Sequence, residues 1–164
     1  MHAAIVTISD RSFRGERPDA SGPVLKTLVE AAGVDVIEMM IIPDDELMIA
    51  MTLTRLVDEV GCALVLTTGG TGLSPRDVTP EATMKVITRR LPGLEMAILH
   101  DSLTRTPFGM LSRAVIGARG QSLVANFPGS PKAVKECFAV IQPVLGHVMK
   151  LLRDEDPHAH VVRR

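Results

Sequence analysis

The apolar and polar positions of this chain alternate between two kinds of segment. Short runs of aliphatic and β-branched residues are typical of strands that are covered on both faces. Longer segments, in which apolar residues recur every three or four positions, are typical of amphipathic helices. The pattern predicts strands at 3–8, 34–42, 63–67 and in two short runs within 113–127, and helices at 21–32, 46–60, 79–90, 92–103 and 131–152.

This alternation of strands and helices predicts an α/β fold, a three-layer α/β/α sandwich with a largely parallel sheet. We interpret residues 1–153 as a single domain, because a chain of 164 residues suits one domain of ordinary size. The polar stretch 154–164 is interpreted as a flexible tail. In folds of this class, ligands bind outside the carboxyl ends of the strands. The polar segments that follow the strands are therefore the first candidates for a site.

Composition and charge narrow the classes of partner. The chain has 18 Lys and Arg against 19 Asp and Glu, a net charge of −1, no Trp, no Tyr and four Phe. We expect no nucleic-acid partner, because such a site needs a basic excess and, for single strands, aromatic rings. The sequence contains no run of 18 consecutive apolar residues, so we expect no membrane span. Cys62 and Cys137 match no metal-ligand pattern and are interpreted as buried apolar residues, which favours a soluble, cytoplasmic protein.

Four polar segments follow the predicted strands and are expected to meet at one edge of the sheet. Ser9 and Asp10 follow the first strand, and Asp44 follows the second. The stretch 69–77 follows the third strand, and 126–130 follows the last. Chemistry-bearing residues are thus concentrated where an α/β fold places its ligands.

The glycine run at 69–72 would let backbone N–H groups approach a phosphate without obstruction by side chains. Helices that begin near residues 80 and 131 could direct their positive ends at the same anion. The run is neither a P-loop nor a dinucleotide fingerprint, because no Gly-Lys-Ser/Thr follows it and position 75 is Pro. Taken alone, it is equally well interpreted as a turn between a strand and a helix.

Asp44 and Asp77 flank this run and are candidates for holding a divalent cation or orienting a nucleophile. Mg²⁺ prefers one or two carboxylates together with substrate phosphates. Helix capping is the alternative interpretation. It is strong for Asp44, because either Asp44 or Asp45 would cap the helix that begins at residue 46, and weaker for Asp77. Ser102, Ser112 and Arg113 are ambiguous by pattern, and structural roles would explain them. Four loop arginines could bind phosphate through bidentate contacts or simply be solvated: Arg11, Arg14, Arg17 and Arg76.

A long motif runs through this region. Residues 67–83, TTGGTGLSPRDVTPEAT, resemble the Mog/MoaB family of molybdenum-cofactor biosynthesis proteins. The motif is far more specific than a glycine-rich loop, and the likeness covers residues 3 to about 152. The other matching segments are 5–10 with 21–23, 42–44, 106–113 and 126–134.

The resemblance implies a molybdopterin-binding fold, a homotrimer, and adenylylation of molybdopterin by ATP with release of pyrophosphate. A downstream molybdate-inserting enzyme would take the product. The resemblance also implies catalytic roles for Asp77 and for Asp44, the latter with Mg²⁺. A pterin carrier without catalysis is the alternative function, because some MoaB-type members share the pattern.

From the resemblance and the polar strand ends together, we predict a set of substrate contacts. The chemistry is consistent with them, because phosphoryl transfer requires mainly positioning and charge neutralisation. For Ser130, helix capping is an alternative role. The predicted contacts are Ser9, Asp10, Gly69, Gly70, Thr71, Gly72, Ser102, Ser112, Asn126, Gly129 and Ser130.

Overall fold

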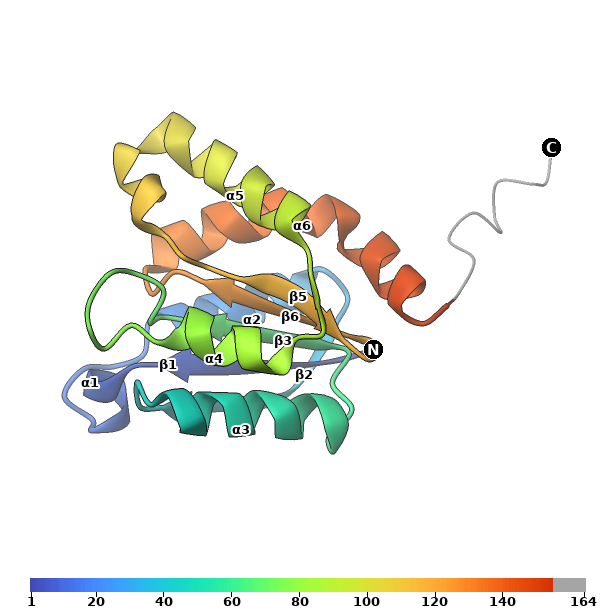
Figure 1. The fold of residues 1–164 in the computed structure, drawn as a ribbon, viewed down its shortest axis with the longest axis horizontal. Helices are drawn as coiled ribbons and strands as arrows, with labels where there is room; N and C mark the ends of the chain where they lie inside the picture. The colour runs from blue at the N-terminus through green and yellow to red at the C-terminus, as the bar shows by residue number, and fades with distance from the viewer. Residues whose placement is uncertain (155–164) are drawn as a thin grey trace.

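The first predicted strand is observed as β1 (His2–Ile8), in the interior of the sheet of the computed structural model (Figure 1). The structure describes residues 1–154. β1 pairs in parallel with β2 (Asp35–Ile42) on one side and with β3 (Leu64–Thr68) on the other. The chain thus leaves β1 toward one edge of the sheet and later returns to its other side.

The second half of the sheet mixes strand directions. β6 (Ser122–Phe127) pairs in parallel with β3, whereas β5 (Ile116–Arg119) is antiparallel to β6, and β4 (Arg89–Arg90) is antiparallel to β5. The described residues form one six-stranded sheet in the order β2-β1-β3-β6-β5-β4. The predicted α/β fold is confirmed, with antiparallel pairing confined to the β5–β4 side.

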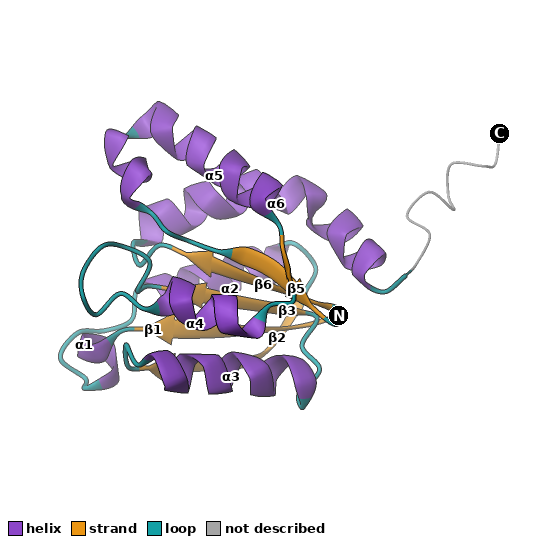
Figure 2. Ribbon diagram, viewed as in Figure 1, coloured by secondary structure: helices purple, strands orange, loops and turns teal. Residues whose placement is uncertain are grey.

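Helices cover both faces of this sheet, as Figure 2 shows. On one face lie α2 (Ser21–Ala31) and α6 (Pro131–Leu152), and α5 (Pro92–Arg105) packs against α6 and β5. On the other face lie α3 (Glu46–Asp58) and α4 (Thr79–Val86). The three layers bury the backbone of the central strands, which explains their continuous apolar sequences.

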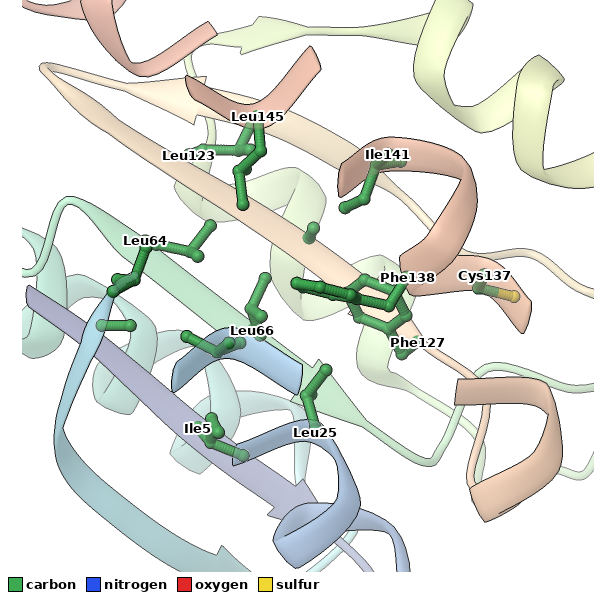
Figure 3. Close-up of a cluster of buried hydrophobic side chains, with 14 of the residues drawn as sticks. Ile5, Leu25, Leu64, Leu66, Leu123, Phe127, Cys137, Phe138, Ile141 and Leu145 are labelled. Carbon is green, nitrogen blue, oxygen red and sulfur yellow. The ribbon is translucent and has the colours of Figure 1, made fainter. Parts of the chain in front are cut away.

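Neighbouring residues of each central strand supply two separate cores, because successive side chains of a strand point to opposite faces. Ile5 packs in the core beneath α2 and α6, whereas Val6 packs beneath α3 and α4. Figure 3 shows the first of these cores, which is mainly aliphatic. Phe127 and Phe138 supply its aromatic rings, with ring centroids 6.3 Å apart.

Three local elements differ from the sequence prediction. The helix predicted at 79–90 ends at Val86, because the segment after it pairs with β5: the backbone N–H groups of Thr88 and Leu91 donate to Ala118 O and Ile116 O. Tertiary pairing overrides helical periodicity here. The four-residue helix α1 (Asp10–Phe13) and the 3₁₀-helix η1 (Pro107–Leu111) were not predicted.

Other expectations concern the cysteines, the membrane and the C-terminal stretch. Cys62 and Cys137 are buried and unpaired, as expected. No helix within residues 1–154 is long and apolar enough to cross a membrane. The predicted flexible tail, 154–164, lies outside the described residues except for Asp154.

Candidate active site

The polar segments meet at the carboxyl ends of β1 and β3. At this point the chain leaves β1 toward β2 on one side of the sheet, and it leaves β3 toward the later strands on the other side. A cavity of about 510 Å³ lies there and is called the first cavity below. Such a position is where open α/β sheets bind ligands. Eight of the predicted site residues line it: Ser9, Asp44, Gly69, Gly70, Thr71, Gly72, Asp77 and Gly129.

The glycine run presents three successive backbone N–H groups without a hydrogen-bond partner among the described residues. The backbone N–H of Gly69 donates to Phe127 O at 3.0 Å, and the Thr79 hydroxyl donates to Gly69 O at 3.0 Å. The next three N–H groups, those of Gly70, Thr71 and Gly72, donate no hydrogen bond within residues 1–154. Successive free N–H groups at a cavity wall form an anion-binding surface.

Gly70 cannot be replaced without strain. Its φ is +63°, a left-handed conformation that favours glycine. A Cβ there would overlap the Thr79 hydroxyl and lie 3.1 Å from Asp44 Oδ1. The glycine therefore lets the loop approach both α4 and the carboxylate of Asp44.

Asp44 and Asp10 hold each other in place. The backbone N–H of Asp10 donates to Asp44 Oδ2 at 2.7 Å, and the backbone N–H of Asp44 donates to Asp10 Oδ1 at 3.1 Å. Asp44 Oδ1 accepts no hydrogen bond among the described residues. The cap of α3 is Asp45, whose Oδ1 accepts from Met48 N at 2.8 Å, so the capping interpretation of Asp44 is wrong.

The two carboxylates have opposite pKa shifts. Burial raises the pKa of Asp44, and the nearby carboxylates of Asp10 and Asp77 raise it further. Burial also acts to raise the pKa of Asp10, but hydrogen bonds from Arg76 and from the Asp44 backbone outweigh it, so the pKa is lowered. The surroundings of Asp44 therefore disfavour its ionised form, and a cation beside the carboxylate would stabilise that form.

Arg17 and Asp19 also line the first cavity. Arg17 lines it and forms no ion pair within the described part of the chain, whereas Arg76 Nε donates to Asp10 Oδ2 at 2.9 Å. Asp19 was missed by the sequence analysis. Its Oδ1 accepts from Gly22 N at 3.0 Å, and its Oδ2 accepts from the Thr7 hydroxyl at 2.7 Å. An Asp shortly before a helix start is a capping signal that could have found it.

A second cavity, of about 680 Å³, adjoins the first and shares Thr71 and Gly72 with it. Its wall is more apolar than that of the first cavity, with side chains from α5 and η1. Besides the shared Thr71 and Gly72, three further predicted site residues line it. The apolar wall includes Met96, Leu99, Phe108 and Leu111, and the three further predicted residues are Ser102, Ser112 and Asn126.

Asn126 is fully engaged inside the protein. It is buried, and its amide nitrogen donates to the hydroxyls of Thr67 at 3.0 Å and Thr83 at 2.9 Å. Its Oδ1 accepts from Val115 N at 3.1 Å. Asn126 thus joins β6 to β3, to α4 and to Val115, the residue before β5, at the wall of the second cavity. Direct contact with a substrate stays a prediction.

The remaining predicted contacts differ in their surroundings. Ser102 hydrogen-bonds the thiol of Cys137, whose pKa burial raises to about 11. Ser112 is exposed at the edge of the second cavity. Ser130 lines neither cavity and caps α6, where its hydroxyl accepts from Ala133 N at 3.4 Å.

Metal binding at the first cavity would depend on very few protein ligands. No group of three or more His, Cys, Asp or Glu side chains within residues 1–154 is arranged to hold a metal ion. Asp44 Oδ1 is a single free carboxylate oxygen beside the glycine run. Such a site fits Mg²⁺, which is held by one or two carboxylates together with phosphates and water.

The sequence of this chain is similar to those of curated molybdenum-cofactor proteins. The curated relatives include the molybdopterin adenylyltransferase of Haemophilus influenzae, which is 44% identical over 147 residues, covering 88% of this chain and 75% of the relative. The molybdenum cofactor synthesis protein cinnamon of Drosophila melanogaster is 41% identical over 92% of this chain. The chain spans only 25% of that longer protein.

Solved structures show the same likeness. The crystal structure of the molybdopterin biosynthesis enzyme MoaB from Thermus thermophilus superposes with a TM-score of 0.89 at 40% identity, covering 94% of this chain and 97% of that one. The model of the probable molybdopterin binding domain matches residues 4–147. This chain therefore belongs to the family of probable molybdopterin binding domains.

Proposed function

We propose that this protein is a molybdopterin adenylyltransferase, which transfers AMP from ATP to the terminal phosphate of molybdopterin. The observation that carries the proposal is the junction of two unlike cavities at Thr71 and Gly72. One cavity has free N–H groups and carboxylates, and the other has an apolar wall. Together they suit a substrate pair in which phosphates meet and a flat heterocycle needs an apolar surface.

The relatives support this assignment. Proteins named molybdopterin adenylyltransferase share 40–44% identity with most of this chain in Haemophilus influenzae and Escherichia coli. The residues of the first cavity supply what nucleotidyl transfer requires, because that reaction depends on positioning and charge neutralisation. A covalent protein nucleophile is not needed.

The reaction joins the two substrates at the junction of the cavities. A terminal phosphate oxygen of molybdopterin attacks the α-phosphorus of ATP and forms a new P–O bond. The bond from the α-phosphorus to the bridging oxygen breaks, and pyrophosphate leaves with that electron pair. The free N–H groups of Gly70, Thr71 and Gly72 stabilise the negative charge on the phosphate oxygens, and Arg17 attracts the polyphosphate.

Asp44 is the residue that would hold Mg²⁺, through its free Oδ1. When bound, the ion supplies neutralisation of the phosphate charge. Asp10 fixes the backbone and the orientation of Asp44, and Arg76 in turn holds Asp10. Asp77 lines the same cavity. The negative charges of Asp44 and Asp77 support a cation requirement, because unneutralised carboxylates would repel ATP.

The proposed product and setting follow from the same activity. The adenylylated pterin would pass to a molybdate-inserting enzyme. We infer a cytoplasmic homotrimer that does not bind nucleic acid. The two unpaired, buried thiols are compatible with a reducing compartment, and exposed apolar side chains on β2 and α5 support self-association.

Release of pyrophosphate tests the function directly. Purified protein with molybdopterin, ATP and Mg²⁺ is expected to release one pyrophosphate for each adenylylated pterin formed, and chelation of Mg²⁺ should stop the release. The matched control is Asp58→Asn, which alters an exposed carboxylate paired with Arg119 away from both cavities and should leave turnover unchanged. Tight pterin binding without adenylylated product would instead establish the carrier function.

A further inference from the structure

Arg113 connects the second cavity to the loop of the first. It lines the second cavity directly after Ser112, and its side chain extends to the loop between β3 and α4. Nε donates to Gly72 O at 2.8 Å, and one terminal nitrogen donates to Asp77 O at 2.6 Å. The other terminal nitrogen forms an ion pair with Glu81 on α4. All three nitrogens of the guanidinium thus take part in linking the segment 72–77 to α4.

The backbone of Arg113 adds a fourth connection. Its N–H donates to Thr71 O at 2.9 Å, so that carbonyl is directed at Arg113. Thr71 and Gly72 are the two residues that both cavities share. Arg113 therefore contacts the loop at the place where the substrates are proposed to meet.

The segment has few other attachments to the rest of the protein. The hydrogen bonds from Ser74 N to Asp77 Oδ2 and from Asp77 N to Ser74 O close the turn on itself. The pair of Arg76 with Asp10 is the other described link from this turn, and the Arg76 side chain is 62% exposed. The Arg113 side chain is about half as exposed, at 33%. An exposed pair restrains a loop weakly, so most of the restraint is assigned to Arg113.

We propose that Arg113 is a positioning residue for adenylyl transfer, which holds the backbone carbonyls of Gly72 and Asp77 beside the junction of the two cavities. The inference deepens the proposed function and rests on it. Arg113 acts through the loop and does not contact the reacting atoms. Misplacement of a catalytic loop by about 1 Å is enough to cost on the order of 100-fold in rate.

Lysine cannot reproduce this arrangement. A guanidinium presents five N–H donors in a rigid plane, whereas an ammonium is a single charged point on a flexible stem. Arg113→Lys keeps the charge but cannot serve Gly72 O, Asp77 O and Glu81 at once. Any loss of activity in this variant therefore reports geometry rather than net charge.

Arg119→Lys is the matched control. Arg119 also bridges a carboxylate and a backbone carbonyl, with its terminal nitrogens donating to Asp58 Oδ2 at 2.6 Å and to Val86 O at 3.0 Å. It belongs to the same region of sequence but lines neither cavity. Both variants lose comparable pairing, so a purely structural contribution should affect them similarly.

The experiment measures pyrophosphate release and amide hydrogen exchange in the intact protein. For Arg113→Lys, kcat is expected to fall about 10- to 100-fold, while KM for ATP and for molybdopterin changes by less than about threefold. The hydrogen-bonded amides within residues 72–77, those of Ser74, Arg76 and Asp77, should exchange about tenfold faster or more, because local opening of the loop costs less free energy. Arg119→Lys should retain wild-type kcat and wild-type exchange in this segment.

Equal kcat in the two variants would overturn the inference, as would unchanged exchange of residues 72–77 in Arg113→Lys. Failure of the proposed function is separately visible, because the wild-type protein would then make no adenylylated product. In that event the exchange measurement alone decides: unchanged protection rejects Arg113 as the anchor of the loop, and faster exchange retains it.

Discussion

Asp44 uses its two carboxylate oxygens differently. Oδ2 accepts a hydrogen bond from the backbone of Asp10, whereas Oδ1 is free of hydrogen bonds within residues 1–154 and lies close to Gly70. Burial and two neighbouring carboxylates raise the pKa of Asp44. The residue therefore ionises at a cost to the folded state, a pattern that is frequent at functional sites.

We predict that Asp44→Asn abolishes activity without destabilising the protein. The amide keeps an oxygen for the Asp10 N–H but cannot bind Mg²⁺ as a carboxylate does, so kcat should fall by about 100-fold or more. Pyrophosphate release and urea unfolding at about pH 7 check the two parts. A variant that keeps wild-type kcat would contradict the assigned role.

The pH dependence of stability gives a second reading of the same variant. A raised folded-state pKa means that the native protein holds this proton more tightly than the unfolded chain. Stability from this group is thus lost as the pH rises from 3.8 through the raised pKa. Asp44→Asn should be at least as stable as the wild type near neutral pH, and the difference should shrink below pH 3.8. Lower stability near neutral pH would be the contrary result.

At the scale of elements, neighbouring residues at the start of α6 have different roles, some at the first cavity and one in the helix cap. Gly129 and Pro131 line the first cavity, whereas Ser130 between them is exposed and caps the helix. The hydroxyl accepts from Ala133 N at 3.4 Å, which is a long hydrogen bond. A helix N-terminus thus approaches the cavity through its backbone, and the Ser130 side chain serves the helix.

We predict that Ser130→Ala weakens the fold slightly and spares activity. Loss of an N-cap should lower the free energy of unfolding by about 0.5–1 kcal/mol, the low end of the range for caps because the bond is long. KM for ATP should stay at the wild-type value, since the side chain lines neither cavity. Urea unfolding and initial rates measure these effects, and a KM raised severalfold would restore Ser130 as a substrate contact.

At the scale of the molecule, apolar side chains remain exposed on opposite parts of the fold. Ile37, on the edge strand β2, is 46% exposed, and Leu103 on α5 is 41% exposed. α5 has no fully buried residue at all among its 14 positions. Apolar surface of this kind is typical of faces that meet another protein, which supports the proposed homotrimer.

Light scattering at micromolar concentration should therefore give a mass of about 53 kDa, three times the 17.7 kDa of the chain. Ile37→Glu and Leu103→Glu place a charge on β2 and on α5, and the variant whose surface forms the interface should show the lower mass. A monomer mass for the wild-type protein would contradict the trimer.

The sequence by itself determined the layers of this fold and the place of its first cavity. Runs such as 3–8 and 63–67 are apolar on both faces, and periodic helices lie between them, so the carboxyl ends of the strands had to gather Asp44 and the glycine run. These signals are local or follow from the order of elements, and burial of apolar surface makes them strong. The long motif added the family, which the comparisons confirm.

Tertiary structure alone decided how these residues are used. The pairing of Arg89–Arg90 with β5 ended the predicted helix early, because backbone hydrogen bonds to a distant strand competed with the helix. Arg113 reaches groups that lie 32 to 41 residues away, so no local pattern could reveal its contacts. The sequence left Asp44 and Asp45 as alternative caps of α3, and the structure places Asp45 in that role, which leaves Asp44 to the cavity. Contacts between residues distant in the chain depend on packing, which composition and periodicity do not encode.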